Sequence, residues 1–365
     1  MAFPVAAALC VGGARALEPG QLLVLANGRS PDSVEVARAY MRLRHIPEAN
    51  LVRLSVPVFP PGRAWALSPA DFTRRIWDPA WKVMRERGIE DRILAWAYSV
   101  HFPIRITTVP ALSIQGLTFL RNRLPDQAAV RRGTYSSPLF AGPTEADGRS
   151  WPAEGFEASR ARLGKDMPLP SMMLGYTGLR GNTKEAVLGC LERAAAADGT
   201  APAGVVYFVT RDNVRSTCRD WQYPAAQREL TALGIEAVIT NRMPVGRTNL
   251  LGLMTGAAVV DPGRGNRFLP GSMAEHLTSA AANFRARHQT KLSVWIDAGA
   301  AASAGTVSEP FALWPKFPNA RFFVHYASGR TMVESFFASI RCPLQILLVG
   351  DPLTRPWPRA GAGAP

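Results

Sequence analysis

Short apolar runs alternate with helix-like segments along the first hundred residues. Residues 21–26 form an apolar run that ends at Asn27-Gly28, a pattern typical of a buried strand that leaves a sheet through a turn. Ser30-Pro31 then begins a segment with apolar positions at helical spacing, and residues 51–56 are again mostly apolar. This order of strand, helix and strand predicts a βαβ-like unit at the start of the chain.

A helix and a central strand are predicted next. Ser68-Pro69 is a typical helix start, and the apolar positions that follow keep helical spacing up to Gly88. Residues 92–98 are almost wholly apolar, as in a strand that is covered on both faces. A parallel sheet is therefore favoured, and we expect residues 17–101 to form an N-terminal α/β lobe.

The periodicity fades between residues 102 and 173, where proline, glycine and serine are frequent. A segment of this length without regular structure is usually functional or flexible. We therefore expect residues 102–173 to be an irregular insertion or an inter-lobe segment, which either flanks a cleft as a lid or serves as a linker.

Regular alternation resumes in residues 174–358. The pattern predicts helices at about 183–196, 224–233, 272–284, 290–298 and 331–340, and strands at 204–209, 235–239, 250–254 and 345–349. Such alternation predicts a C-terminal core of the α/β class, built as a three-layer sandwich with a mainly parallel sheet. Residues 359–365 are rich in Ala, Gly and Pro and are expected to be a frayed tail.

The N-terminus has the features of a secretory signal. An apolar stretch ends in the small-x-small sequence Ala14-Arg15-Ala16, which predicts a signal peptide over residues 1–16 and an exported, periplasmic or extracellular protein. The segment lacks a basic n-region, so an ordinary buried first strand stays as the alternative. No apolar run of about 18 residues follows, so we expect no transmembrane span in the mature chain.

The strong positive charge raises the question of nucleic acid. The chain carries 42 Lys and Arg against 28 Asp and Glu, a formal net charge of +14. Only five of the basic residues are lysines, and abundant Ala, Gly and Pro accompany the arginines, as in proteins from GC-rich genomes. The arginines are scattered and do not form a run interleaved with aromatics, so we expect no specific nucleic-acid partner and leave the partner unknown.

Cysteine and motif spacing bear on metals and cofactors. Three cysteines remain after the leader, and a Cys190–Cys218 disulfide is one option in an oxidising compartment, with Cys342 left over. The sequence has no C-x-x-C and no H-E-x-x-H, and the glycine-containing loop after residues 250–254 has no nucleotide-binding fingerprint. We therefore expect no metal and no cofactor.

The candidate chemistry lies mainly near predicted strand ends, where open α/β sheets bind ligands. His276 and Ser279 are three residues apart and share one face of the helix expected at 272–284, so they can hydrogen-bond. Histidine is the side chain best suited to proton transfer near neutral pH. The alternative is a histidine that only packs or caps.

Three further residues have both a chemical and a structural interpretation. Glu309 ends a run of small residues and can orient an imidazole, or it is a solvated loop carboxylate. Asp351 follows the last predicted strand and either supports a site or closes an Asx-turn. Cys342 is a lone thiol that serves as a nucleophile or only as a packing residue.

Several segments resemble an uncharacterised family of exported bacterial proteins. They are residues 27–37, 171–178, 289–291, 298–300, 305–310 and 349–353. The likeness covers nearly the whole mature chain, but the family has no assigned activity.

The C-terminal half also resembles, more distantly, the gingipain-type cysteine peptidases, which implies a caspase-like fold. The likeness lies in the Ala-Gly segment 298–307, the helix 331–336 and the closing Gly-Asp-Pro at 350–352. Where these peptidases have a His-Gly turn this chain has Thr255-Gly256, and near the expected nucleophile it has Leu277-Thr278-Ser279 without a cysteine. Losing both partners removes the thiolate–imidazole pair.

Two hypotheses follow. The first is a binding scaffold without peptidase activity on a caspase-like fold. The second is a hydrolase with a rearranged site, in which Ser279 or Cys342 is the nucleophile and His276 is the base, supported by Glu309 or Asp351.

Overall fold

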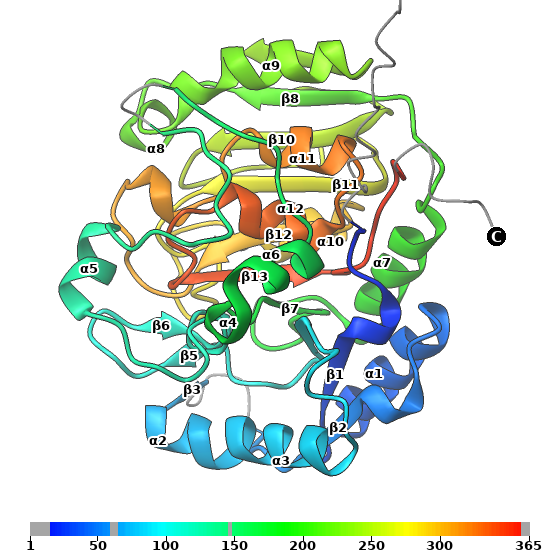
Figure 1. Ribbon diagram of the computed structural model, residues 1–365. Coiled ribbons are helices and arrows are strands. Elements are labelled where there is room, and N and C mark those ends of the chain that lie inside the picture. Colours follow the sequence, from blue (N-terminus) through cyan, green and yellow to red (C-terminus); the bar gives the residue numbers. More distant parts are fainter. Residues whose placement is uncertain (1–14, 59–64, 145–147, 359–365) are drawn as a thin grey trace, which may run out of the picture.

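A ten-stranded sheet runs through the whole molecule (Figure 1). The computed structural model describes residues 15–58, 65–144 and 148–358. The strand order is β2-β1-β4-β7-β13-β12-β11-β10-β8-β9. The strands are β1 (Leu22–Asn27), β2 (Leu51–Leu54), β4 (Ala95–Tyr98), β7 (Ser171–Met173), β8 (Val205–Val209), β9 (Glu236–Thr240), β10 (Leu250–Gly256), β11 (Phe268–Leu277), β12 (Ala302–Thr306) and β13 (Ile346–Gly350).

The sheet consists of two parallel halves that point in opposite directions. Strands β2, β1, β4, β7 and β13 are parallel to one another, and so are β12, β11, β10, β8 and β9. The halves meet where β12 pairs antiparallel with β13, from Ala302 opposite Gly350 to Thr306 opposite Ile346. The carboxyl ends of the two halves therefore lie at opposite edges of the sheet, and each edge is a separate place for a site.

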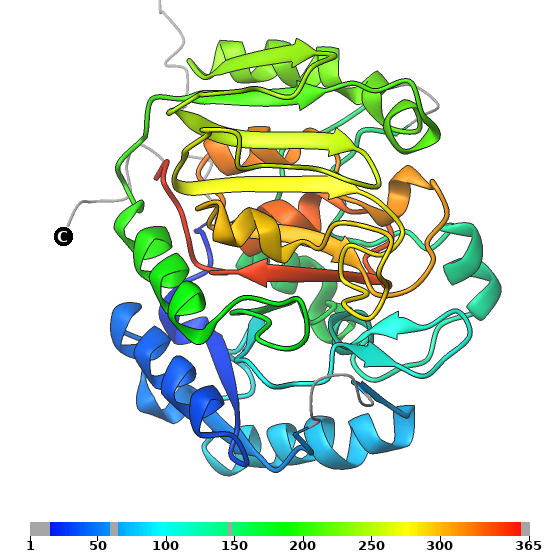
Figure 2. The same cartoon turned by 180° about the vertical axis from the view of Figure 1, so that it is seen from behind.

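Helices cover both faces, which gives the three-layer α/β sandwich predicted from the sequence. The face turned to the viewer in Figure 2 carries α1 (Pro31–Leu43), α7 (Lys184–Ala196) and α10 (Ser293–Asp297). The other face carries α4 (Ile114–Phe119), α9 (Tyr223–Ala232), α11 (Phe322–Ala327) and α12 (Met332–Ser339). The caspase-like character of the C-terminal half stays a prediction.

The N-terminal βαβ unit forms as its sequence predicts. Ser30 is the N-cap of α1, where its hydroxyl accepts a hydrogen bond from the Ser33 N–H, and Pro31 occupies the first turn. The buried face of α1 carries Val36, Ala37, Tyr40 and Met41. Farther along, α2 (Pro69–Phe72) and α3 (Asp78–Glu86) continue one another through a π-helical turn. Trp77 of that turn packs on Trp96 of β4 with ring centroids 5.5 Å apart.

The prediction of a helix at residues 272–284 is wrong, because the first part of this stretch belongs to strand β11 of the main sheet. Every residue from Gly271 to Leu277 is buried, since β11 lies between β10 and β12 and is covered on both faces. The strand contains Glu275 and His276 among small and apolar residues, so it has neither the alternation of a half-buried strand nor a continuous apolar run, and its periodicity does not distinguish it from a helix. The helix expected at 290–298 is present in shorter form as α10.

Residues 102–173 contain more regular structure than the sequence indicated. In a second sheet, the short strand β5 (Arg105–Ile106) pairs with β3 (Ala66–Leu67) on one side and with β6 (Leu112–Ser113) on the other. The segment also holds α4, α5 (Gln127–Arg132) and α6 (Phe156–Leu163), and it supplies β7 to the main sheet. These elements are too short to leave a clear period in the sequence, although α4 is buried along its whole length.

The three described cysteines are reduced thiols. Cys190, Cys218 and Cys342 are all free, so the Cys190–Cys218 disulfide considered from the sequence is not formed. Most of the expected signal peptide and all of the expected tail lie outside the described residues. No described helix has the length and apolar character needed to cross a bilayer.

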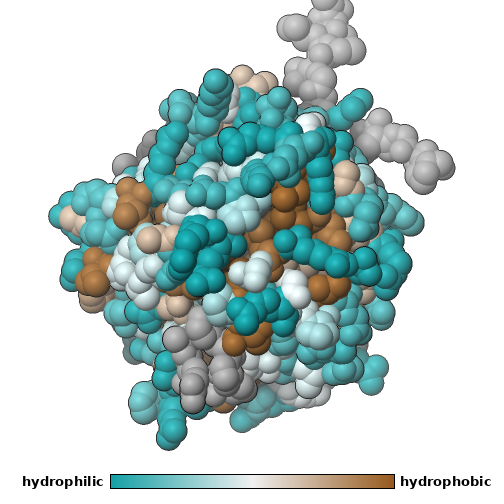
Figure 3. Space-filling view, turned by 90° about the horizontal axis from the view of Figure 1, so that it is seen from below, coloured by the Kyte–Doolittle hydropathy of each residue, from teal (hydrophilic) through white to brown (hydrophobic). Residues whose placement is uncertain are grey.

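The face of the molecule seen from below is mostly hydrophilic, with hydrophobic side chains gathered near its middle (Figure 3).

Candidate functional site

His276 is a fully buried residue of β11 whose two ring nitrogens are both engaged. The indole Nε1–H of Trp295 donates to Nδ1 at 2.8 Å, and Nε2 lies 3.1 Å from the carbonyl oxygen of Thr290. Since Nδ1 accepts, the hydrogen of the neutral ring is on Nε2, which donates to Thr290. Burial lowers the pKa of His276 to about 4. Such an imidazole is packed and neutral, with no free nitrogen for a substrate.

Ser279 and Glu309 contact each other but are not bonded to His276. The Ser279 hydroxyl donates to Glu309 Oε1 at 3.1 Å, and the same oxygen accepts from the Phe311 N–H at 2.8 Å. Because His276 is in a strand, Ser279 is no longer on a shared helix face with it. No hydrogen bond joins these two side chains in the described part of the chain. The structure thus brings together Ser279 and Glu309 and leaves the imidazole apart.

Asp351 has the structural role that was one of its two interpretations. Its Oδ1 accepts from the Leu353 N–H at 2.9 Å, which is an Asx-turn, and from the Tyr40 hydroxyl at 2.7 Å. Its Oδ2 accepts from Nε of Arg44 at 2.7 Å, and the Arg44 guanidinium also pairs with Asp198. Asp351 is fully buried, so this network fastens the end of β13 to α1.

Cys342 is a buried thiol without the surroundings of a nucleophile. Burial raises the pKa of its thiol to about 11, although the ammonium of Lys316 acts in the opposite direction. Nucleophilic cysteines require a lowered pKa and access to the substrate, and Cys342 has neither.

The ends of β10 and β11 are neighbours in the sheet. Thr255 lies opposite His276 and Gly256 lies opposite Leu277 in a parallel ladder. A Cβ at Gly256 would collide with the backbone of Arg215, so only glycine fits there. The two places at which the sequence departs from the gingipain-type pattern therefore lie side by side, and neither carries a cysteine.

A histidine that the sequence interpretation missed lies at the other edge of the sheet. β1 has β2 on one side and β4 on the other, so the chain reverses its winding direction between β1 and β4. Ligands of open α/β sheets bind at such a switch point, outside the carboxyl ends of the strands. His101 follows β4 there, and its Nδ1 is 2.5 Å from the Ser30 hydroxyl that follows β1.

His101 has a strained backbone and an aromatic environment. Its φ of 61° lies in the left-handed region, and the Asn27 side-chain amide holds its carbonyl oxygen at 2.9 Å. His101 lines a cavity of about 60 Å³ together with Val58, Trp65, Phe102, Pro103, Tyr176 and Gly178. Burial lowers the pKa of His101, and the Asp32 carboxylate acts against that effect.

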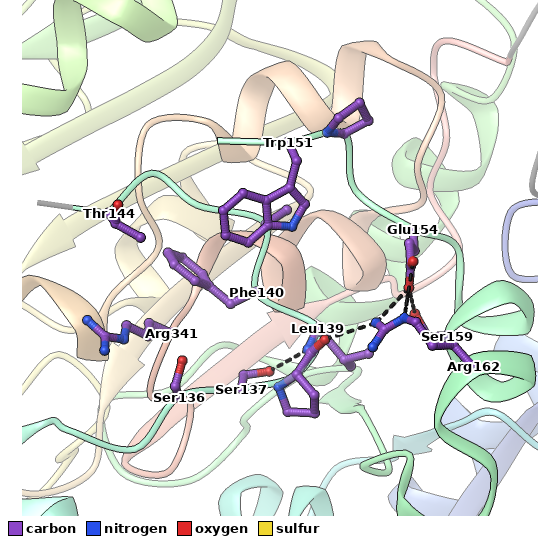
Figure 4. A pocket seen from close by; sticks show the side chains of 13 residues that line it. Ser136, Ser137, Leu139, Phe140, Thr144, Trp151, Glu154, Ser159, Arg162 and Arg341 are labelled. Atoms are coloured by element: carbon purple, nitrogen blue, oxygen red, sulfur yellow. Dashed lines mark hydrogen bonds and ion pairs between the residues drawn. The ribbon is translucent and has the colours of Figure 1, made fainter. Parts of the chain in front are cut away.

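A cavity of about 420 Å³ lies between the segment that precedes α6 and the end of α12 (Figure 4). Phe140 and Trp151 are in the middle of the view, and the Glu154–Arg162 pair and Arg341 are on opposite sides of them. Trp151 is 43% exposed.

The two arginines of this cavity differ in their partners. Arg162 donates to Glu154 from Nε at 2.9 Å and from Nη2 at 2.7 Å. These hydrogen bonds lower the pKa of Glu154. The guanidinium of Arg341 has no acidic partner among the described residues, while its backbone carbonyl accepts from the Ser137 N–H at 2.8 Å. Arg341 is therefore the cation of this cavity that is available to a ligand.

Comparison with protein-family models, with curated proteins and with solved structures gave no match. Within residues 15–58, 65–144 and 148–358, no group of three or more His, Cys, Asp or Glu side chains is arranged to hold a metal ion.

Proposed function

We propose that the chain is an exported binding protein without peptidase activity, and that it binds an anionic ligand with a flat apolar part in the cavity beside Arg341 and Trp151. The observation that carries the proposal is a guanidinium without an acidic partner in a cavity that also has two aromatic side chains. The volume of about 420 Å³ is within the range of small-molecule sites, which is about 300–1,000 Å³.

The charges of this cavity favour an anion over a cation. Arg162 and Glu154 neutralise each other, so Arg341 supplies the net charge. A guanidinium binds carboxylate and phosphate groups through two parallel hydrogen bonds. The exposed ring of Trp151 offers a flat surface for an apolar ring of the ligand. An aryl carboxylate has both features and is the simplest probe.

The absence of peptidase activity is argued from His276 and from the strand ends. A general base must reach the proton that it abstracts and works best with a pKa near the working pH. His276 is buried, both of its nitrogens are occupied, and burial lowers its pKa to about 4. The resemblance to a caspase-like scaffold then concerns the frame of the molecule and not its chemistry.

The binding proposal is tested by calorimetry, in which indole-3-acetate is titrated into the wild-type protein and into Arg341→Met. We expect at least tenfold weaker binding in the variant, because a charge-assisted hydrogen bond contributes about 1.5–3 kcal/mol. Arg242→Met, which removes an exposed arginine outside the cavity, should bind like the wild type. Equal affinity of Arg341→Met and Arg242→Met, or no binding by the wild type, would refute this site.

A peptide-library digestion with His276→Ala as control tests the second part of the proposal. We expect no cleavage, with or without reductant and calcium. Cleavage by the wild-type protein that disappears in His276→Ala would overturn the non-peptidase assignment and restore the rearranged hydrolase.

A further inference from the structure

We propose a second binding site at the carboxyl ends of β1, β4 and β7, in which Nε2–H of His101 donates a hydrogen bond to a neutral carbonyl group of a small ligand. This site is independent of the Arg341 cavity and lies at the switch point of the sheet. Three strands contribute to it. Ser30 follows β1, His101 follows β4 and Tyr176 follows β7.

Ser30 determines which nitrogen of His101 carries the hydrogen. The Ser30 oxygen already accepts from the Ser33 N–H at 3.1 Å. In the part of the chain that the structure covers, the only acceptor for the hydrogen of this hydroxyl is Nδ1 of His101, 2.5 Å away. The ring hydrogen is then on Nε2, which has no hydrogen-bond partner within the described ranges. The imidazole is thus oriented and presents a donor to the cavity it lines.

The backbone holds His101 in place at an energetic cost. A non-glycine residue in the left-handed region costs about 1 kcal/mol or more. The Asn27 side chain offsets this conformational cost, because its amide N–H donates to the His101 carbonyl oxygen at 2.9 Å. Its amide oxygen accepts from the Val56 N–H at 3.3 Å. Strain of this kind persists only where the surrounding structure enforces it, and it gathers at binding sites.

The lining of the cavity selects a neutral group. Apart from His101, the residues that line it are uncharged, and the aromatic rings of Trp65, Phe102 and Tyr176 form most of its wall. The flanking charges are of both signs, since the Asp32 carboxylate acts on His101 and the Arg105 guanidinium lies over the Trp65 ring, 5.6 Å from its centroid, so neither an anion nor a cation is favoured. About 60 Å³ accommodates a few non-hydrogen atoms, so an amide or ester group fits and a whole aromatic ring does not.

The proposal is tested by NMR of the ¹⁵N-labelled imidazoles during titration with N-methylacetamide, with sodium acetate as the charged probe of similar size. We expect a saturable change at Nε2 of His101 that acetate does not reproduce. His101→Asn should abolish binding and still fold, because asparagine tolerates the left-handed region. His45→Asn is the matched control, since His45 is exposed and also has a positive φ, of 51°.

The role of Ser30 is tested by the ¹⁵N NMR signals that report the tautomer of His101. Ser30→Ala should populate both tautomers of His101 and weaken binding of the amide several-fold. Ser68→Ala removes an N-cap hydroxyl of the same kind from α2 and should leave His101 unchanged. An amide that binds His101→Asn as it binds the wild type, acetate that binds equally well, or a tautomer that is the same in Ser30→Ala would each overturn the proposal.

Discussion

Replacing His276 with glutamine should reduce the loss of stability that the protein suffers in mild acid. In the folded protein a second ring hydrogen would have to occupy Nδ1, where the Trp295 indole already donates. Burial lowers the pKa of the folded His276 to about 4, whereas the unfolded chain has a histidine pKa of about 6.5. The unfolded state therefore binds the proton first. The stability that neutral His276 provides is complete above about pH 6.5 and is lost as the pH falls toward 4.

The size of the effect follows from these two pKa values. Between pH 7 and pH 5, His276 should remove about 2 kcal/mol from the free energy of unfolding, at about 1.4 kcal/mol per pH unit. His325 is also buried, and burial lowers its pKa to about 3. It should remove a similar amount over the same interval. His276→Gln should thus reduce the acid loss between pH 7 and pH 5 by about 2 kcal/mol, while His325 and His101, whose pKa burial also lowers, continue to contribute.

Urea unfolding at pH 7, 6 and 5, followed by tryptophan fluorescence, measures this contribution. At pH 7 the variant should be about 1–3 kcal/mol less stable, because the Trp295 N–H loses its acceptor. Its dependence on pH should nevertheless be flatter than that of the wild type. The exposed His288 gives the control His288→Gln, which should follow the wild-type curve. Parallel curves for the wild type and His276→Gln would show that His276 titrates normally and would refute its assignment as a packed residue.

The other predictions concern packing, charge and thiols. A Cβ at Gly116 would collide with the Leu344 carbonyl, so Gly116→Ala should lower the free energy of unfolding by about 3 kcal/mol or more. Gly189→Ala is the control, because a Cβ there would contact only the flexible end of a side chain, and it should change the free energy of unfolding by about 1 kcal/mol or less. The midpoints of urea unfolding measure both effects. Asp351→Asn removes the buried one of the two carboxylates that pair with Arg44 and leaves only the more exposed Asp198, so it should cost about 3 kcal/mol in the same assay, and a loss under about 1 kcal/mol would contradict the network. Among the described cysteines, iodoacetamide followed by mass spectrometry should label only Cys218 in the folded protein, and all three in urea, because the other two are buried.

The sequence predicted helix α1 and the fully buried strands β4 and β13, but it missed the strand β11. Helix α1 has a cap, an early proline and a 3.6-residue period, so its position was predictable. β11 has polar residues, Glu275 and His276, within a buried run, and both are satisfied only by distant partners. Arg219 pairs with Glu275, and Trp295 donates to His276. Without these partners the run fits a helix as well as a strand.

The candidate sites depend on neighbours that are far apart along the chain. Ser30 and His101 are separated by 71 positions, and their contact requires β1 and β4 to be adjacent. The sequence places both residues after predicted strands, which was a usable signal, but it does not give the strand order. Arg341 and Trp151 line the same cavity for a similar reason, since the segment before α6 lies beside the end of α12. Single-sequence patterns report local structure and leave such pairings open.

The position of β13 affects how the chain is assembled. Residues 22–173 supply the strands of one half of the sheet and residues 205–306 supply those of the other, but the strand that joins them, Ile346–Gly350, is synthesised last. Until it leaves the ribosome, β7 and β12 are open edges whose N–H and C=O groups are unpaired and prone to aggregation. Premature termination a few residues before Ile346 would leave two half-sheets without the strand that pairs with both β7 and β12.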